Sequence, residues 1–199
     1  MHTPDLITPI AHVCNTYVAA RQLPFKNTPM RKTLKDIADG ISSLVAPISP
    51  TLRVDYSIGK GSWAFHPWVA VYDTRVTDTV RHGICAGMSW NDDMSGFAYG
   101  IFFGREGLSE HTGKHIDSHA IERLTFISQA AGIYADAFPT TSEQHVYSRF
   151  SYSTHARWLG FYHSRKRLPD NNTLIHTFLF TLMVYTTITP AWIERYGTH

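Results

Sequence analysis

Cysteine is scarce in this sequence: the 199 residues include only Cys14 and Cys85, which lie far apart along the chain. Two distant cysteines give no disulfide framework, which favours a reducing compartment and predicts a cytoplasmic protein. An excess of one charge is also missing, because 18 Lys and Arg stand against 16 Asp and Glu for a formal net charge of +2. Any binding to nucleic acid must therefore come from local basic clusters rather than from overall charge.

Long apolar runs are missing as well. The most apolar stretch, residues 174–188, contains His176 and several threonines and is shorter than a bilayer span. The first residues lack the basic and then apolar pattern of a secretory signal. Residues 107–114 approach a nucleotide-binding P-loop, but their glycines are one residue too far apart and no Ser or Thr follows the lysine. We therefore expect neither a membrane partner nor nucleotide hydrolysis through a P-loop.

The residues that are present describe one ordinary globular domain. With 43% hydrophobic and 17% charged residues, the composition is that of a folded rather than a disordered chain. We expect a single domain over residues 1–199. Its expected parts are a helical segment at 1–48, a sheet core at 51–104, and helices with a basic and aromatic segment at 116–199.

Hydrophobic periodicity predicts an α/β (α+β) fold in which helices flank a twisted mixed β-sheet of about five strands. Thr28 and Pro29 have the residue types of a helix N-cap and first helical position. Helical spacing covers residues 5–20, 28–47, 118–136 and a stretch from about 171. Strand patterns cover residues 52–58, 68–72, 83–90 and 96–103, with one or two further short strands within 146–162.

Residues 51–73 hold the most informative pattern. Every second residue from 52 to 58 is apolar, as in a strand with one buried face. Gly59 and Gly61 then flank Lys60 in a tight loop, and a second apolar run begins at Trp68. With Trp63 between the two runs, two indoles and a lysine gather at one end of the sheet, where a flat ligand stacks easily. A core position for Trp68 is the alternative, because tryptophan is usually buried.

An ordered set of short motifs extends this pattern over about fifty residues. The set comprises Leu52-Arg53-Val54, Ser57, Gly59-Lys60-Gly61, Trp63, Pro67-Trp68-Val69-Ala70, Gly83-Ile84 and Ala98-Tyr99-Gly100-Ile101. In this order the motifs resemble the N-terminal DNA-binding domain of McrB, the recognition subunit of modified-cytosine-dependent restriction systems. The resemblance covers residues 51–104 well and the remainder only through the order of the expected elements.

The resemblance implies a function in phage defence. It implies that the chain recognises methylated or otherwise modified cytosine, such as 5-methylcytosine, in double-stranded DNA by flipping the base out of the duplex. It also implies a specificity module without catalysis or cofactor, whose GTPase motor and nuclease belong to other domains or partner proteins.

Pocket residues follow from the same resemblance. Trp68 occupies the position of the family's stacking tryptophan, and either Tyr147 or Val146 corresponds to the family's remaining pocket aromatic. Cys85 and Ser89 fall on the third strand, where the best-known member has tyrosine and leucine. A smaller and more polar wall predicts a different or larger modification, for example a hydroxymethyl group or a bulkier one, or another base.

DNA contacts are expected from one loop and from separate basic residues. The loop comprises Ser57, Gly59, Lys60, Gly61, Ser62 and Trp63. Lys60 stands where the best-known member has a tyrosine near the gap that the flipped base leaves, so we expect Trp63 or water in that gap and Lys60 on a phosphate. The basic residues for the DNA backbone are Arg149, Arg157, Arg165, Lys166 and Arg167.

Two other function classes remain open. His111, His115 and His119 are four residues apart, a spacing that would align three metal ligands on one helix face in a metal-dependent hydrolase or nuclease. Gly113 and a helix start near Ser118 argue against one shared helix. The third possibility is a protein-interaction module that uses the aromatic residues of 147–162. Asp92 and Asp93 are expected in a turn, and Cys85 as a small apolar filler rather than a nucleophile.

Overall fold

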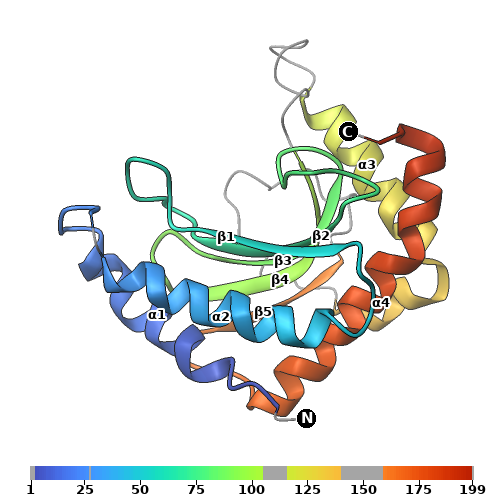
Figure 1. Cartoon of the computed structure of the whole chain (residues 1–199). Helices are drawn as coiled ribbons and strands as arrows, with labels where there is room; N and C mark the ends of the chain where they lie inside the picture. Colours follow the sequence, from blue (N-terminus) through green and yellow to red (C-terminus); the bar gives the residue numbers. More distant parts are fainter. Residues whose placement is uncertain (1–2, 27, 105–115, 140–158, 199) are drawn as a thin grey trace.

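The computed structural model describes residues 3–26, 28–104, 116–139 and 159–198 (Figure 1). Its elements are α1 (Ile7–Ala20), α2 (Pro29–Val45), β1 (Leu52–Ser57), β2 (Trp68–Asp73), β3 (Ile84–Trp90), β4 (Gly96–Phe103), α3 (Ile116–Ala131), a 3-10 helix η1 (Gly132–Ala137), β5 (Gly160–Ser164) and α4 (Asn171–Tyr196). These elements confirm the predicted fold class, with helices beside a five-stranded sheet.

The sheet has the strand order β1-β2-β3-β4-β5, and every neighbouring pair is antiparallel. The expectation of a mixed sheet is therefore corrected to an antiparallel one. The chain reverses between β1 and β2, between β2 and β3, and between β3 and β4 through connections too short for the crossover that a parallel pair requires. As a result, the end of β1, the start of β2, the end of β3, the start of β4 and the end of β5 all lie at one end of the sheet, which we call the loop end.

Local sequence accounts for the helix boundaries. The Thr28 side chain accepts a hydrogen bond from the Met30 backbone N–H, and Pro29 follows as the first helical residue, as predicted. Asp170 caps α4 by accepting from the Thr173 backbone N–H at 2.9 Å. The helix predicted to run to about 136 ends at Ala131 instead, because Gly132 adopts a positive φ of 54° and the chain continues as η1.

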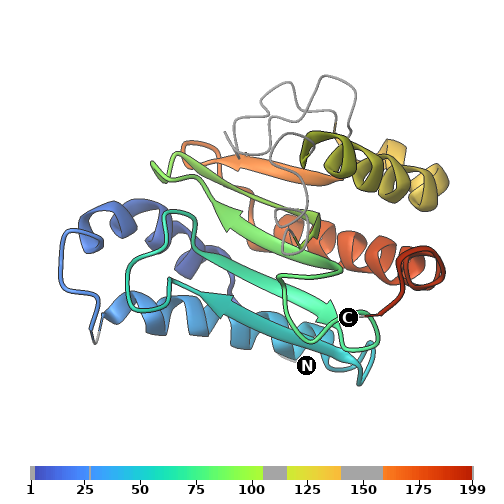
Figure 2. The ribbon, with the colours of Figure 1, turned by 90° about the horizontal axis from the view of Figure 1, so that it is seen from above.

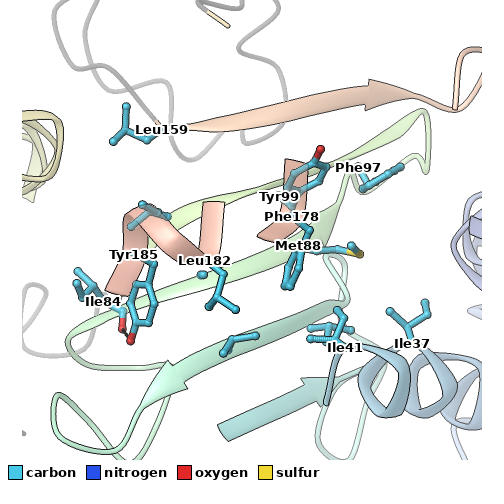
Figure 3. Packing of buried hydrophobic residues seen from close by; sticks show 14 of the residues in the cluster. Ile37, Ile41, Ile84, Met88, Phe97, Tyr99, Leu159, Phe178, Leu182 and Tyr185 are labelled. Carbon is cyan, nitrogen blue, oxygen red and sulfur yellow. Dashed lines mark hydrogen bonds between the residues drawn. The ribbon is translucent and has the colours of Figure 1, made fainter. Parts of the chain in front are cut away.

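One face of the sheet carries the hydrophobic core. Helices α1, α2 and α4 lie on this face, α2 against β1 and β2, α4 against β3 and β4, and α3 packs beside α4 (Figures 1 and 2). The large side chains of this helix-covered face alternate along the strands as Val69, Val71, Ile84, Met88, Trp90, Phe97, Tyr99 and Ile101. Phe178, Leu182 and Tyr185 of α4 pack onto them (Figure 3). The helices thus cover the face opposite to the one that carries Trp68.

Helix α4 is both long and apolar. Its 26 residues include a window of mean hydropathy 1.4, and it is the one helix in the described part of the chain that is long and apolar enough to cross a membrane. Half of that window is buried inside the protein. Phe178, Leu182 and Tyr185 fill the core, so the apolar character of α4 is explained by its packing against β3 and β4.

The other face of the same strands has small side chains in its middle. By the strand register this small-residue face carries Trp68 and Ala70 on β2, Cys85, Gly87 and Ser89 on β3, and Ala98, Gly100 and Phe102 on β4. A Cβ added to Gly87 would lie 3.1 Å from the Val69 carbonyl oxygen and 3.2 Å from the Ala70 Cβ. The backbone and small side chains therefore form a close-packed floor, with larger residues only toward its ends.

Candidate nucleic-acid interface

A pocket with a volume of about 240 Å³ lies on the small-residue face. Its walls and floor come from Trp68 and Ala70 of β2, from Cys85, Gly87 and Ser89 of β3, and from Phe102 of β4. Segments outside the strands add His66 before β2 at one end of the sheet, and Val80 before β3 and Gly104 after β4 at the other. The pocket thus runs along the strands from the loop end toward the opposite end of the sheet.

Three of the four residues expected in a base pocket line this one cavity, namely Trp68, Cys85 and Ser89. Trp68 and Ser89 are directly paired across β2 and β3, which places them at the same level of the sheet. The Trp68 side chain is half-buried, so part of its indole surface borders the pocket rather than the core. Tyr147, the fourth expected residue, lies outside the described residues.

Ser89 and Cys85 supply different chemistry to the pocket wall. The buried Ser89 hydroxyl donates a hydrogen bond to the Pro67 carbonyl oxygen at 3.1 Å, so the hydroxyl proton is committed while the oxygen keeps its lone pairs as acceptors. Burial raises the pKa of the Cys85 thiol to about 12. The thiol is therefore neutral at physiological pH, which fits the expected role of a small apolar filler and argues against a nucleophile.

The pocket lining also includes residues that the sequence did not single out as site residues, among them His66, Val80 and Phe102. Phe102 pairs with Cys85 across β3 and β4, and this register was the signal that would have found it. The His66 ring Nδ1 lies 3.1 Å from the Trp90 carbonyl oxygen, which accepts only, so Nδ1 carries the proton in this hydrogen bond. Val80 reaches the pocket through the shape of the β2–β3 connection, which residue spacing does not predict.

The glycine loop between β1 and β2 depends on backbone geometry that other residues avoid. Gly59 has φ of 117°, and a Cβ at this position would clash with the Ser62 carbonyl. The Ala64 backbone N–H donates to the Ile58 carbonyl at 2.7 Å, which closes the loop. The Ser57 hydroxyl supports it further by accepting from the Gly59 N–H at 2.9 Å. Lys60 is consequently held, exposed, at the loop tip.

Trp63 anchors this loop and is not among the residues that line the pocket. Its indole packs edge-on against Tyr17 and Phe25, with ring centroids 5.5 Å away in both cases. Its Nε1–H donates to the Leu23 carbonyl at 2.9 Å. A tryptophan tied to α1 and the segment after it in this way is poorly placed to move into a DNA duplex, in contrast to the gap-filling role considered for it from the sequence.

Phe65 is the aromatic residue that the same loop exposes. Its side chain is 65% exposed, one residue before His66 of the pocket. The Arg21 guanidinium lies 4.5 Å from the centre of the Phe65 ring, and Arg21 also donates to the Asp92 carbonyl at 3.0 Å. This cation–π contact holds the Phe65 ring at the surface, one residue away in the chain from His66 of the pocket.

The basic run Arg165–Arg167 lies at the loop end of the sheet, directly after β5. All three side chains are exposed. The Arg165 backbone N–H donates to the Ser95 carbonyl at 2.8 Å, and its guanidinium donates to the Cys14 carbonyl at 3.3 Å. These bonds place the run beside the β3–β4 turn, on the same end of the sheet as Lys60. Two other expected backbone contacts, Arg149 and Arg157, lie outside the described residues.

The features considered for metal chemistry take simpler structural roles. Among the described residues no group of three His, Cys, Asp or Glu side chains is arranged to hold a metal ion. His119 is exposed and 3.8 Å from Glu122, whereas His111 and His115 lie outside the described residues. The Asp93 carboxylate accepts from the Ser95 N–H at 2.8 Å, and these hydrogen bonds lower its pKa. The expected turn at Asp92 and Asp93 is thus confirmed.

Comparison with known proteins gives one family. A family model described as "MrcB-like, N-terminal domain" matches residues 12–189, which include every described strand, the pocket and the basic run. No curated protein and no solved structure gives a significant match.

Proposed function

Because this chain belongs to the MrcB-like N-terminal domain family, the DNA-binding modules of restriction systems, we propose that it recognises a modified base in duplex DNA. In this proposal the base, a methylated or otherwise modified cytosine, flips out of the duplex and enters the pocket beside Trp68. The observation that carries the proposal is the half-buried indole of Trp68 at the border of a cavity of about 240 Å³ on the small-residue face of the sheet.

Energetics assign separate roles to the pocket and to the loop end. Flipping a base costs a few kcal/mol in lost stacking and pairing. Stacking on one aromatic side chain returns about 1–3 kcal/mol, so Trp68 offsets the cost without supplying much net affinity. The affinity then comes from phosphate contacts, for which Lys60, Lys166 and Arg167 are exposed at the loop end.

The gap in the duplex calls for an apolar side chain, and Phe65 is the suitable one in the glycine loop. Proteins that distort DNA commonly insert such a side chain between base steps. Phe65 is exposed beside the pocket, whereas Trp63 of the same loop is fixed by Tyr17, Phe25 and Leu23. We therefore assign the gap to Phe65 rather than to Trp63, and a phosphate to Lys60.

The chain acts in this proposal as a specificity module without catalysis. The motor and nuclease steps of a restriction system belong to other domains or partner proteins, and the site of action is cytoplasmic DNA. The buried, neutral thiol of Cys85 supports the role of a pocket wall rather than of a nucleophile.

Replacement of Trp68 by alanine tests the proposal. Affinities are measured for duplexes that carry cytosine, 5-methylcytosine, 5-hydroxymethylcytosine, 4-methylcytosine or 6-methyladenine at one position. We expect the wild type to prefer one modified duplex over plain DNA and Trp68→Ala to lose this preference while retaining weak, salt-sensitive binding. Tyr72→Ala is the matched control, because Tyr72 lies on the same face of β2 but not in the pocket.

Two results would contradict the proposal. An equal loss of binding to modified and plain duplexes in Trp68→Ala would remove the pocket role. Binding to oligonucleotides that is undetectable, or that does not weaken as salt rises, would favour a protein-interaction module instead, since phosphate contacts always bring salt dependence.

A further inference from the structure

The pocket is longer than one stacked base needs. Its described lining falls on three levels along the strands: Trp68 with Ser89, then Ala70 with Gly87, then Cys85 with Phe102. Successive levels on a strand are two residues apart, or about 6.6 Å, so the first and third levels are separated by about 13 Å. A pyrimidine stacked on Trp68 fills the space between the first and second levels. The space between the second and third levels then remains for another group.

The middle level keeps this length open. Gly87 has no side chain, and its neighbours across the sheet are Ala70 on β2 and Gly100 on β4. A Cβ at Gly87 would already press on the Ala70 Cβ at 3.2 Å, so the floor is as flat as the backbone permits. A group that extends from the base can therefore pass over Gly87 toward Phe102.

The far end of the pocket, formed by Val80, Cys85, Phe102 and Gly104, differs in chemistry from the end near Trp68. The polar groups Ser89 and His66 lie near Trp68. At the far end the described lining consists of two hydrocarbon side chains, a neutral thiol and a glycine, without a charged group. A charged substituent placed there would lose its hydration without gaining a charged partner in the described lining, which is costly, whereas an apolar one gains from burial.

We infer that the far end of the pocket is a subsite for an uncharged, mainly apolar substituent on the flipped base, larger than a methyl group. The inference rests on the proposed function, since it needs a base on Trp68. It makes Val80, Cys85 and Phe102 the residues that set the size of the accepted modification, and Gly87 the residue that gives the substituent its path.

Duplexes with synthetic cytosines test the subsite directly. The probes carry 5-methylcytosine, 5-propynylcytosine or 5-carboxylcytosine at the same position. Each additional buried carbon contributes about fourfold to affinity and the propynyl group has two more carbons than the methyl group, so we expect the propynyl duplex to bind about fifteenfold more tightly than the methyl duplex. The carboxyl duplex should bind about tenfold or more weakly than the methyl duplex, because the carboxylate stays charged.

Filling the far end should reverse the preference. In Cys85→Phe we expect the propynyl duplex to lose its advantage over the methyl duplex. Val80→Phe fills the same end from a connection outside the sheet and serves as the second variant if Cys85→Phe unfolds. Urea unfolding of both variants shows which of them is folded before binding is measured.

The binding results distinguish a failure of the subsite from a failure of the proposed base recognition. Rejection of the propynyl duplex by the wild type, or equal losses for both duplexes in the filled variants, would overturn the subsite. If Trp68→Ala at the same time abolished the preference for 5-methylcytosine over cytosine, the base pocket would stand without the subsite. If Trp68→Ala left every preference unchanged, the proposed function itself would fail.

Discussion

The two faces of the central sheet use the same strands for opposite purposes. On the helix-covered face, alternate residues are large and fully buried, such as Trp90, Phe97 and Tyr99. On the small-residue face, the residues between them are serine, alanine and glycine, and a cavity lies over them. Moving one residue along β3 therefore exchanges a tightly packed environment for one that borders the cavity.

Because the two faces differ in this way, stability and recognition can be changed separately in one strand. Core packing depends on close contacts among large side chains, so removing one leaves a cavity that costs free energy of unfolding. A binding pocket depends on missing side chains, so its residues contribute less to folding and more to the choice of ligand. Substitutions on each face should accordingly affect one property and leave the other nearly unchanged.

The largest effect is expected from Phe178 on the helix-covered side. Phe178 of α4 is 1% exposed and packs against Tyr99, with ring centroids 6.3 Å apart. Phe178→Ala should lower the free energy of unfolding by about 3–5 kcal/mol, measured by urea denaturation. DNA affinity per folded molecule should stay close to that of the wild type. A loss of preference for modified DNA in the folded fraction would contradict the claim that substitutions on the helix-covered face change stability without changing recognition.

A smaller effect, dependent on pH, is expected at the edge of the helix-covered face. Asp73 is fully buried, and the Arg75 guanidinium donates to both of its carboxylate oxygens, at 3.0 and 2.6 Å. Burial acts to raise the pKa of Asp73, but the hydrogen bonds and charge of Arg75 outweigh it and hold the pKa below its ordinary value of 3.8. The stabilisation is therefore present above about pH 4 and is lost as the pH falls through the lowered pKa.

Asp73→Asn should accordingly cost about 1–3 kcal/mol at pH 7, and the difference from the wild type should shrink below pH 4. Urea unfolding at pH 7, 5 and 3.5 measures both values. Asp39→Asn is the control, because the ion pair between Asp39 and Lys35 on α2 is exposed and contributes little. A difference between wild type and Asp73→Asn that grows on acidification would contradict the assignment.

Exposed basic residues lie both at the loop end of the sheet and on helix α2, so the two groups can be compared. Lys166 and Arg167 lie exposed at the loop end, where the proposal places the DNA backbone. Lys32 and Lys35 lie on α2 and form ion pairs with Asp36 and Asp39 at 2.8 and 2.6 Å. Replacing Lys166 and Arg167 by alanine should weaken binding to modified and plain duplexes alike. The slope of log affinity against log salt should fall by about 0.9 for each phosphate that the protein no longer neutralises.

The matched double variant of Lys32 and Lys35 should leave the salt slope unchanged. Titrations at several salt concentrations give both slopes. An equal reduction in the two double variants would indicate general charge attraction rather than an interface at the loop end.

Local patterns were sufficient for much of the fold and part of the site. Alternation and short apolar runs predicted the four strands from 52 to 103, and Thr28 with Pro29 predicted the start of α2, because these patterns depend on neighbours in the chain. The resemblance led to Trp68, Cys85 and Ser89, which the structure brings into one pocket. The other half of the pocket depends on strand register and loop shape, which is why Phe102 and Val80 were missed.

Long-range packing explains the remaining differences. Trp63 and Phe65 are two aromatic residues of one loop, and sequence alone gives no reason to treat them differently. The contacts of Trp63 with Tyr17 and Leu23, about forty residues earlier, make one an anchor and leave the other exposed. The antiparallel order of all five strands likewise depends on where the chain returns as β5 after α3, which no local pattern reveals.

The smallest effect is expected from the two cysteines, one on each side of the sheet. Cys14 of α1 is 1% exposed, and Cys85 on the small-residue face is 6% exposed. Burial raises the pKa of Cys14 to about 11 and that of Cys85 to about 12, so less than about one thiol in a thousand is ionised at pH 8. Neither thiol should react with iodoacetamide in the native protein within an hour, and both should react in urea, as read by mass spectrometry. Reaction of Cys85 alone in the native state, with protection by a bound duplex, would mean that the far end of the pocket is more open to solvent than the burial of Cys85 indicates. The difference between the helix-covered face and the small-residue face would still hold.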